Sequence, residues 1–148
     1  MTPRDPDFAG KVRRAFAKQA FMELLGATLG EIGPGRVEIV LPIRPELAQQ
    51  HGYAHAGAAW AIADSAAGYA AQTLIAPQDG VLTVELKINL LAPARGTCLT
   101  ARGQVERAGR RLTVARSDVV ALDETGRETG VALAIGTFMC MEGLDADG

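Results

Sequence analysis

The feature that most constrains the fold is an alanine-rich segment from His55 to Ile75, which contains a single charged residue, Asp64. Nine of its 21 positions are alanine, and its apolar residues fall on every side of a helical projection. A helix that is apolar all round has to be buried, and at about 1.5 Å per residue it would be about 30 Å long. We therefore expect a long central helix that other parts of the chain surround closely.

The rest of the chain predicts one more helix and a set of antiparallel strands. Apolar residues at helical spacing predict a helix from Phe8 to Leu25 that stops at Gly26. Alternation and turn residues predict strands at 27–31, 36–41, 82–91, 97–106, 111–122 and 128–140. In the third of these, alternation places Thr83 on the polar face, away from the helix. The pattern indicates an α+β fold in a single domain over residues 1–148, with short flexible termini.

Composition and charge narrow the class of protein. The 148 residues are 48% hydrophobic and 22% charged, and the formal net charge is −2. Such a chain has no strong field to attract nucleic acid or an anionic membrane. The beginning does not resemble a signal peptide, and alanine is only weakly hydrophobic, which disfavours a membrane span at 56–75. We expect a cytoplasmic protein with no nucleic-acid or membrane partner.

The two cysteines indicate neither a disulfide nor a metal site. Cys98 and Cys140 lie far apart without C-x-x-C spacing, and the chain has only two histidines. We expect two free thiols and no bound metal.

The beginning of the alanine-rich helix and Asp64 form the best candidate site. The first N–H groups of a helix lack partners, so those of Ala56 and Gly57 suit a developing oxyanion. Asp64 follows His55 by nine residues, about 13 Å along the axis, so the helix start cannot cap it. A carboxylate among alanines is costly without a partner, and that partner comes from another segment or another subunit. A purely structural Asp64 is the alternative.

The order of these motifs resembles a known family. The run His55-Ala56-Gly57 followed by Ala63-Asp64-Ser65-Ala66 resembles the H-G-G…A-D-x-A signature of hotdog-fold thioesterases, in particular the PaaI-like branch related to 4-hydroxybenzoyl-CoA thioesterases. The strand from Thr83 to Pro93, the Gly109–Leu112 turn and the run Gly136-Thr137-Phe138 extend the likeness over essentially the whole chain. The resemblance implies a hotdog fold, in which an antiparallel sheet wraps around a long central helix. It also implies homodimers that often pair into tetramers.

The resemblance implies an activity and roles for five residues. The activity is hydrolysis of an acyl-CoA thioester to free acid and CoA, with no cofactor apart from the CoA of the substrate. Asp64 would act as nucleophile or general base, while the N–H of Ala56 or Gly57 from the partner subunit binds the thioester carbonyl. Gln49 would orient the water or the carboxylate, and the Thr83 hydroxyl would assist. This sequence departs from the family at Ala56, where relatives have glycine, and at Gln49, where many have asparagine.

Other residues near these motifs have two possible roles each. His55 is either an acid–base group or, as we favour, a residue that bonds backbone and fixes the loop. Tyr53 either lines the acyl pocket or covers the core. Arg95, Arg110 and Arg111 suit the phosphates of CoA, although solvated surface arginines are the simpler interpretation.

Two alternative functions remain open from the sequence. The alanine at position 56 favours a hotdog protein that binds acyl-CoA without turnover. A hydratase on the same fold would need a different acid–base pair, typically Asp or Asn with His, which the sequence does not match.

Overall fold

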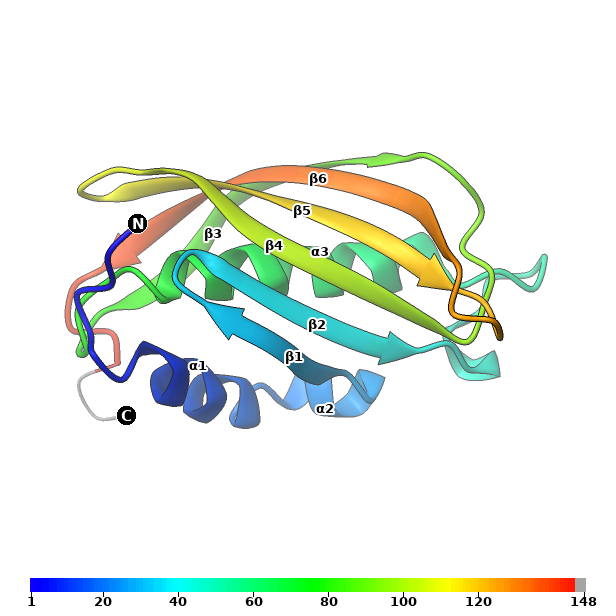
Figure 1. Cartoon of the computed structure of the whole chain (residues 1–148), viewed down its shortest axis with the longest axis horizontal. Coiled ribbons are helices and arrows are strands. Elements are labelled where there is room, and N and C mark those ends of the chain that lie inside the picture. The colour runs from blue at the N-terminus through cyan, green and yellow to red at the C-terminus, as the bar shows by residue number, and fades with distance from the viewer. Residues whose placement is uncertain (146–148) are drawn as a thin grey trace.

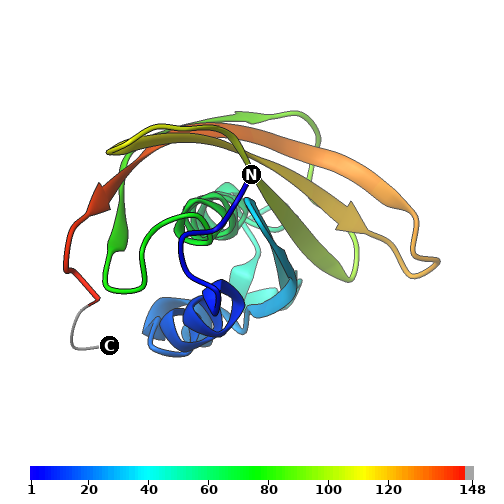
Figure 2. The same ribbon diagram turned by 60° about the vertical axis from the view of Figure 1, so that its left-hand side comes forward.

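A long helix lies in the hollow of a curved sheet (Figures 1 and 2). The computed structural model describes residues 1–145. The alanine-rich segment forms α3 (Ala56–Gln72), with His55 as its N-cap. Its end falls three residues before the predicted one, because 73–75 form a turn. The predicted layout, a sheet wrapped around a buried helix, is confirmed.

The sheet has six strands, and all neighbouring strands are antiparallel. In chain order they are β1 (Thr28–Gly33), β2 (Arg36–Pro42), β3 (Gly80–Leu90), β4 (Cys98–Ala108), β5 (Leu112–Leu122) and β6 (Glu128–Met141). In space the order is β1-β2-β4-β5-β6-β3. The strand that follows α3 in the chain, β3, therefore lies at one edge of the sheet. A short 3-10 turn, η1 (Pro45–Leu47), precedes the loop into α3.

Small residues allow α3 to lie directly on the concave face of the sheet. Ile62, Ala63, Ala66 and Ala67 of the helix have no exposed surface. At Gly103 of β4 the contact is closest, because a Cβ atom there would lie 2.2 Å from the carbonyl oxygen of Ala66. The alanine content of α3 thus reflects the close approach that the sequence predicted.

The first helix is broken where the sequence predicts continuity. Two helices, α1 (Phe8–Ala17) and α2 (Ala20–Leu25), replace the single helix expected from Phe8 to Leu25. Gln19 leaves the helical conformation, with φ −83° and ψ 86°, and its side chain bonds two residues of α3. These contacts between distant segments outweigh the local helical pattern. The predicted stop at Gly26 is confirmed, because Gly26 has a left-handed φ of 77°.

A bulge in β3 reverses the face on which Thr83 lies. Thr83 and Glu85 pair with the adjacent residues Phe138 and Thr137 of β6, which leaves Val84 as an extra residue. One extra residue moves the side chains before it to the opposite face of the strand. Thr83 consequently faces α3 and bonds it. The prediction that Thr83 points away from the helix is wrong for this reason.

Both ends of the described chain pack near the turn between α3 and β3. The ammonium group of Lys11, a buried residue of α1, donates to the carbonyl oxygens of Ala76, at 2.7 Å, and Asp79. The Asp79 carboxylate accepts from the N–H of Gly143 at 3.1 Å. These bonds hold α1 and the segment around Gly143 beside the turn that follows α3. The last part of the tail expected to be flexible, residues 146–148, lies outside the described residues.

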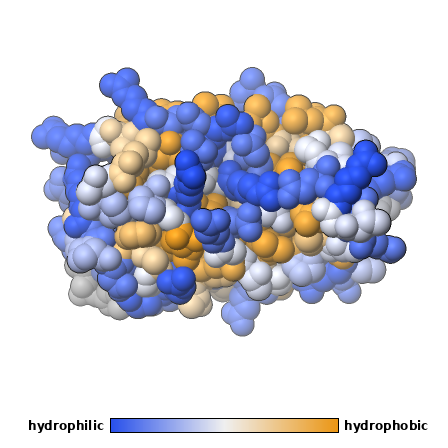
Figure 3. Space-filling model, in the orientation of Figure 1, coloured by the Kyte–Doolittle hydropathy of each residue, from blue (hydrophilic) through white to orange (hydrophobic). Residues whose placement is uncertain are grey.

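The outer face of the sheet carries both polar and apolar side chains, which are the mixed blue and orange areas of Figure 3. Arg102 forms ion pairs with Glu38 on one side and Glu128 on the other. The two cysteines are free thiols, as predicted. Within residues 1–145, no helix is long and apolar enough to cross a membrane.

Candidate active site

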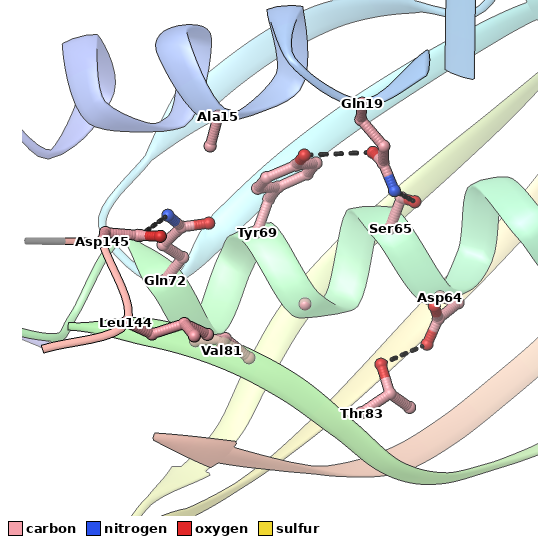
Figure 4. Close-up of a pocket in the computed structure, with 11 residues that line it drawn as sticks. Ala15, Gln19, Asp64, Ser65, Tyr69, Gln72, Val81, Thr83, Leu144 and Asp145 are labelled. Atoms are coloured by element: carbon pink, nitrogen blue, oxygen red, sulfur yellow. Dashed lines mark hydrogen bonds between the residues drawn. The ribbon is translucent and has the colours of Figure 1, made fainter. Parts of the chain in front are cut away.

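Asp64 lies two turns into α3, partly buried, with its carboxylate directed toward β3 (Figure 4). The Thr83 hydroxyl donates a hydrogen bond of 2.8 Å to Oδ1 of Asp64. Burial raises the pKa of the Asp64 carboxyl, and the bond from Thr83 partly offsets that increase. The partner that the buried carboxylate requires therefore comes from another segment of the same chain. This bond occupies only one of the two carboxylate oxygens.

Asp64 and Thr83 line a cavity of about 220 Å³ between α1, α3 and β3. Its other polar residues include Gln19, Ser65 and Tyr69. The Tyr69 hydroxyl donates to Oε1 of Gln19 at 3.0 Å, and Nε2 of Gln19 donates to the Ser65 hydroxyl at 3.3 Å. The sequence analysis did not include these three residues in the site. Spacing gave no signal for them, because residues one and five positions after Asp64 do not lie on its face of the helix, and Gln19 belongs to a distant segment.

The beginning of α3 forms a second group of candidate residues. Nδ1 of His55 accepts a hydrogen bond of 2.8 Å from the N–H of Gly57. His55 therefore bonds the backbone at the start of the helix, and this bond engages one of the two N–H groups proposed for the thioester carbonyl. Ala56 is the first residue of α3, so its N–H has no partner within the helix. Of the two candidates, the Ala56 N–H is the one not already bonded to His55.

Gln49 and Tyr53 lie beside this helix start. Together with His55 and Ala56 they line a cavity of about 550 Å³. Oε1 of Gln49 accepts from the N–H of His51, which leaves the Gln49 amino group as its donor. The Arg95 guanidinium lies 4.5 Å from the centre of the Tyr53 ring and donates to its hydroxyl. This pair fixes Tyr53 at the cavity.

The remaining arginine candidates lie elsewhere. Arg110 and Arg111 are exposed in the turn between β4 and β5. Arg110 lines a separate cavity with Leu74 and Ile75, just beyond the end of α3. The structure therefore does not bring them together with Arg95.

Within one chain, the two groups of candidate residues do not form one site. Ala56 and Asp64 are eight residues apart on α3, about 12 Å along the axis, and they line different cavities. Each group has half of the chemistry of acyl transfer: a carboxylate base in one, and a free N–H at a helix start in the other. A single chain carries both halves but does not join them.

Comparison with known proteins identifies the family. The model of the thioesterase superfamily matches residues 51–127, just over half of the chain. A protein of Saccharolobus solfataricus named "Putative esterase SSO1253" is 30% identical over 129 residues, which cover 87% of this chain and 83% of that protein. The chain belongs to the thioesterase superfamily, and thioester hydrolysis is the general activity that this membership supports.

Solved structures confirm the hotdog fold. A thioesterase family protein from Silicibacter pomeroyi is 43% identical, with a TM-score of 0.89, and the match covers 92% of this chain and 99% of that one. The conserved protein PA5202 from Pseudomonas aeruginosa is 28% identical, with a TM-score of 0.78 and coverage of 86% and 98%. The E. coli PaaI protein from the phenylacetic acid degradation operon shares the fold at 20% identity, with a TM-score of 0.80 and coverage of 92% and 94%.

Proposed function

We propose that the protein hydrolyses an acyl-CoA thioester to the free acid and CoA, at a site that two copies of the chain build together. The observation that carries this proposal is the environment of Asp64. Its carboxylate is partly buried, has a raised pKa, is held by Thr83 and lines a cavity. A carboxylate with a raised pKa beside a cavity suits a general base, and the bond from Thr83 fixes its orientation.

Asp64 acts on the carbonyl carbon, either through water or directly. As a general base it removes a proton from water that attacks the thioester, and the tetrahedral intermediate then expels the CoA thiolate, which takes up a proton. As a nucleophile it displaces the CoA thiolate and forms a mixed anhydride that water then cleaves. A raised pKa makes the carboxylate a stronger base in either role. Thr83 holds Oδ1, so Oδ2 is the reacting oxygen. A single turnover in heavy-oxygen water reveals direct attack when water cleaves the anhydride at Cγ of Asp64, because an unlabelled Asp64 oxygen then enters the first product, whereas the general-base route gives a labelled product.

The second copy supplies the group that binds the thioester carbonyl. We assign this role to the N–H of Ala56, because the N–H of Gly57 already bonds His55. The positive end of the α3 dipole stabilises the oxyanion at the same place. Gln49, which lines the same cavity, orients the attacking water or the carboxylate of Asp64. Tyr53, which also lines this cavity, would line the acyl pocket, and Arg95, which bonds the Tyr53 hydroxyl, would contact a phosphate of CoA.

The exposed edge of the sheet suits the pairing of two chains. Leu82, Val84 and Leu90 of the edge strand β3 are 51%, 55% and 58% exposed, and Trp60 on α3 is 41% exposed. An exposed apolar edge strand tends to pair with another chain, and association buries its apolar side chains. We propose a homodimer across this edge. Leu112, Ile135 and Met139, which are also exposed, are available for pairing of dimers into a tetramer.

The direct test is a panel of acyl-CoA thioesters from acetyl to long-chain and aromatic, with release of CoA thiol as the readout. We expect turnover of at least one class, and loss of most of it in Asp64→Asn, whose side chain keeps the shape and the acceptor for Thr83 but cannot take a proton. Gln49→Ala should lower the rate less severely. If Asp64→Asn turns over the panel as fast as wild type, Asp64 is not the catalytic residue.

A second function is acyl-CoA binding without turnover. Two observations favour it: Ala56 replaces the glycine of the family motif, and His55 occupies the N–H of Gly57. Tight binding of acyl-CoA in a titration, with no thiol released from any member of the panel, would establish this function in place of hydrolysis.

A further inference from the structure

The cavity beside Asp64 contains a hydrogen-bond network that thioester hydrolysis does not require. Its bonds run in one direction, from the Tyr69 hydroxyl to Gln19 and from Gln19 to the Ser65 hydroxyl (Figure 4). A hydroxyl group has one proton and two lone pairs. Tyr69 therefore still offers a lone pair, and Ser65 still offers its proton. Among residues 1–145, no other side-chain hydrogen bond uses either hydroxyl group. One acceptor and one donor thus line the same cavity.

The network lies at a defined distance from the reacting carboxylate. Ser65 and Tyr69 are four residues apart on one face of α3. Tyr69 follows Asp64 by five residues, a rise of about 7.5 Å along the helix axis. The two residues are also about 140° apart around the helix, so the path between their side chains crosses the cavity beside Gly68 and is longer than this rise. An acyl chain of medium length, with its carbonyl at Asp64, spans such a path. The far end of such a chain would therefore meet the Tyr69–Gln19–Ser65 network rather than an apolar wall.

The charges of the cavity limit what that far end can be. Among residues 1–145, its lining includes the carboxylates of Asp64 and Asp145 and no Lys, Arg or His. The buried ammonium of Lys11 lies 3.9 Å from Oδ2 of Asp145 and offsets that charge, so Asp64 is the carboxylate that would repel a second carboxylate on the acyl group. Burial and the charge of Asp145 raise the pKa of Tyr69 to about 12, so at neutral pH its hydroxyl stays protonated and continues to donate to Gln19. The cavity suits a neutral polar group.

We propose that the Tyr69–Gln19–Ser65 network binds a hydroxyl group at the far end of the acyl chain, so that the enzyme prefers neutral, ω-hydroxylated acyl groups of medium length. A hydroxyl accepts from Ser65 and donates to Tyr69 at the same time, which satisfies both groups. An unsubstituted chain leaves both hydroxyl groups without a partner. Burying a polar group without a hydrogen bond costs free energy, so the site binds a chain without a hydroxyl group less well. This inference rests on the proposed function.

The same bonds also hold Gln19 at the break between α1 and α2, so the test must separate recognition from packing. The probes are hexanoyl-CoA, ω-hydroxyhexanoyl-CoA and adipoyl-CoA, which differ only at the far end. For wild type we expect kcat/KM to be about 5- to 30-fold higher for the hydroxylated than for the unsubstituted chain, as one to two hydrogen bonds imply. Adipoyl-CoA should be the poorest of the three.

Two variants remove the hydroxyl groups, and a third is the control for packing. In Tyr69→Phe and in Ser65→Ala, the ratio of kcat/KM between the hydroxylated and the unsubstituted chain should fall toward one. Phe16 packs on the Tyr69 ring, with ring centres 5.9 Å apart, and has no hydrogen-bonding group. Phe16→Leu should therefore change the rates with both substrates alike and keep their ratio.

The possible failures are distinguishable. If wild type cleaves the three probes with equal kcat/KM, or if Tyr69→Phe and Ser65→Ala both leave the ratio unchanged, the inference is overturned and thioester hydrolysis stands. If no thioester of the wider panel releases thiol, the proposed function itself fails.

Discussion

Asp64 experiences two influences that move its pKa in opposite directions: burial raises the pKa, and the hydrogen bond from Thr83 lowers it. In Thr83→Val the second influence is lost, so the pKa of Asp64 rises further. If the ionised carboxylate is the active form, activity is lost as pH falls through this pKa. The acid limb of kcat/KM should then move to higher pH in Thr83→Val.

The control for this shift is Thr83→Ser, which keeps the hydroxyl and should retain the wild-type acid limb. The measurement is kcat/KM of wild type and both variants over a range of pH, with folding checked at the lowest and highest pH. An identical acid limb in wild type and Thr83→Val would contradict the role assigned to Thr83.

The N–H of Ala56 can be removed by a substitution that the local backbone tolerates. Proline is accepted at the first position of a helix, because its missing N–H has no helical partner there. His55 has φ −62° and ψ 140°, which is the extended conformation that a residue before proline adopts. Ala56→Pro should therefore fold normally and lose about 100- to 1,000-fold in kcat, the cost of one oxyanion donor.

Ala56→Gly is the matched control, because it changes the side chain and keeps the N–H. The kcat values of both variants measure the contribution of the Ala56 N–H, and thermal unfolding checks that both variants fold. A folded Ala56→Pro enzyme with the turnover of wild type would show that the thioester carbonyl is bound elsewhere.

At the scale of the elements, the contact between α3 and β4 depends on a residue without a side chain. A Cβ atom at Gly103 would lie 2.2 Å from a backbone oxygen of Ala66, and a backbone atom cannot turn aside as a side chain can. Gly103→Ala should push the helix away from the sheet and lower the free energy of unfolding by about 2–3 kcal/mol.

Gly130 on β6 is a suitable comparison, because a Cβ atom there has nothing within 4 Å. Gly130→Ala should be neutral, or stabilising by about 0.4–1 kcal/mol, since alanine restricts the unfolded chain. Urea denaturation of both variants measures the difference. Equal stabilities would mean that α3 does not press on β4 as closely as the structure indicates.

The elements also show what the sequence could predict and what it could not. The position of α3 follows from an apolar composition that only a buried helix explains, and the strands of the sheet follow from alternation. The break at Gln19 was missed because its cause is a pair of bonds to Ser65 and Tyr69 on another helix. The bulge at Val84 was missed because one extra residue leaves no mark on the alternation of the β3 sequence, although it turns Thr83 toward Asp64. Both errors concern contacts between distant segments, and both bear on the site.

At the scale of the whole molecule, the two half-sites explain why a second chain is needed. The carboxylate of Asp64 and the N–H of Ala56 line different cavities of one chain, while apolar residues of β3 remain exposed at the sheet edge. In a twofold dimer each chain can give its Asp64 to one site and its Ala56 to the other. Association and catalysis then depend on the same surface.

Mixing two inactive variants tests this arrangement. Asp64→Asn lacks the base and Ala56→Pro lacks the oxyanion donor, so each homodimer has two defective sites. In a heterodimer, one site receives Asp64 from one chain and the N–H of Ala56 from the other, and is intact. If the chains exchange at random, half of the dimers are mixed and half of their sites are intact, so an equimolar mixture should recover about a quarter of wild-type activity. Native mass spectrometry on differently tagged chains confirms that exchange has occurred. A mixture that contains heterodimers, yet is no more active than its two components, would place Asp64 and the Ala56 N–H in separate functions.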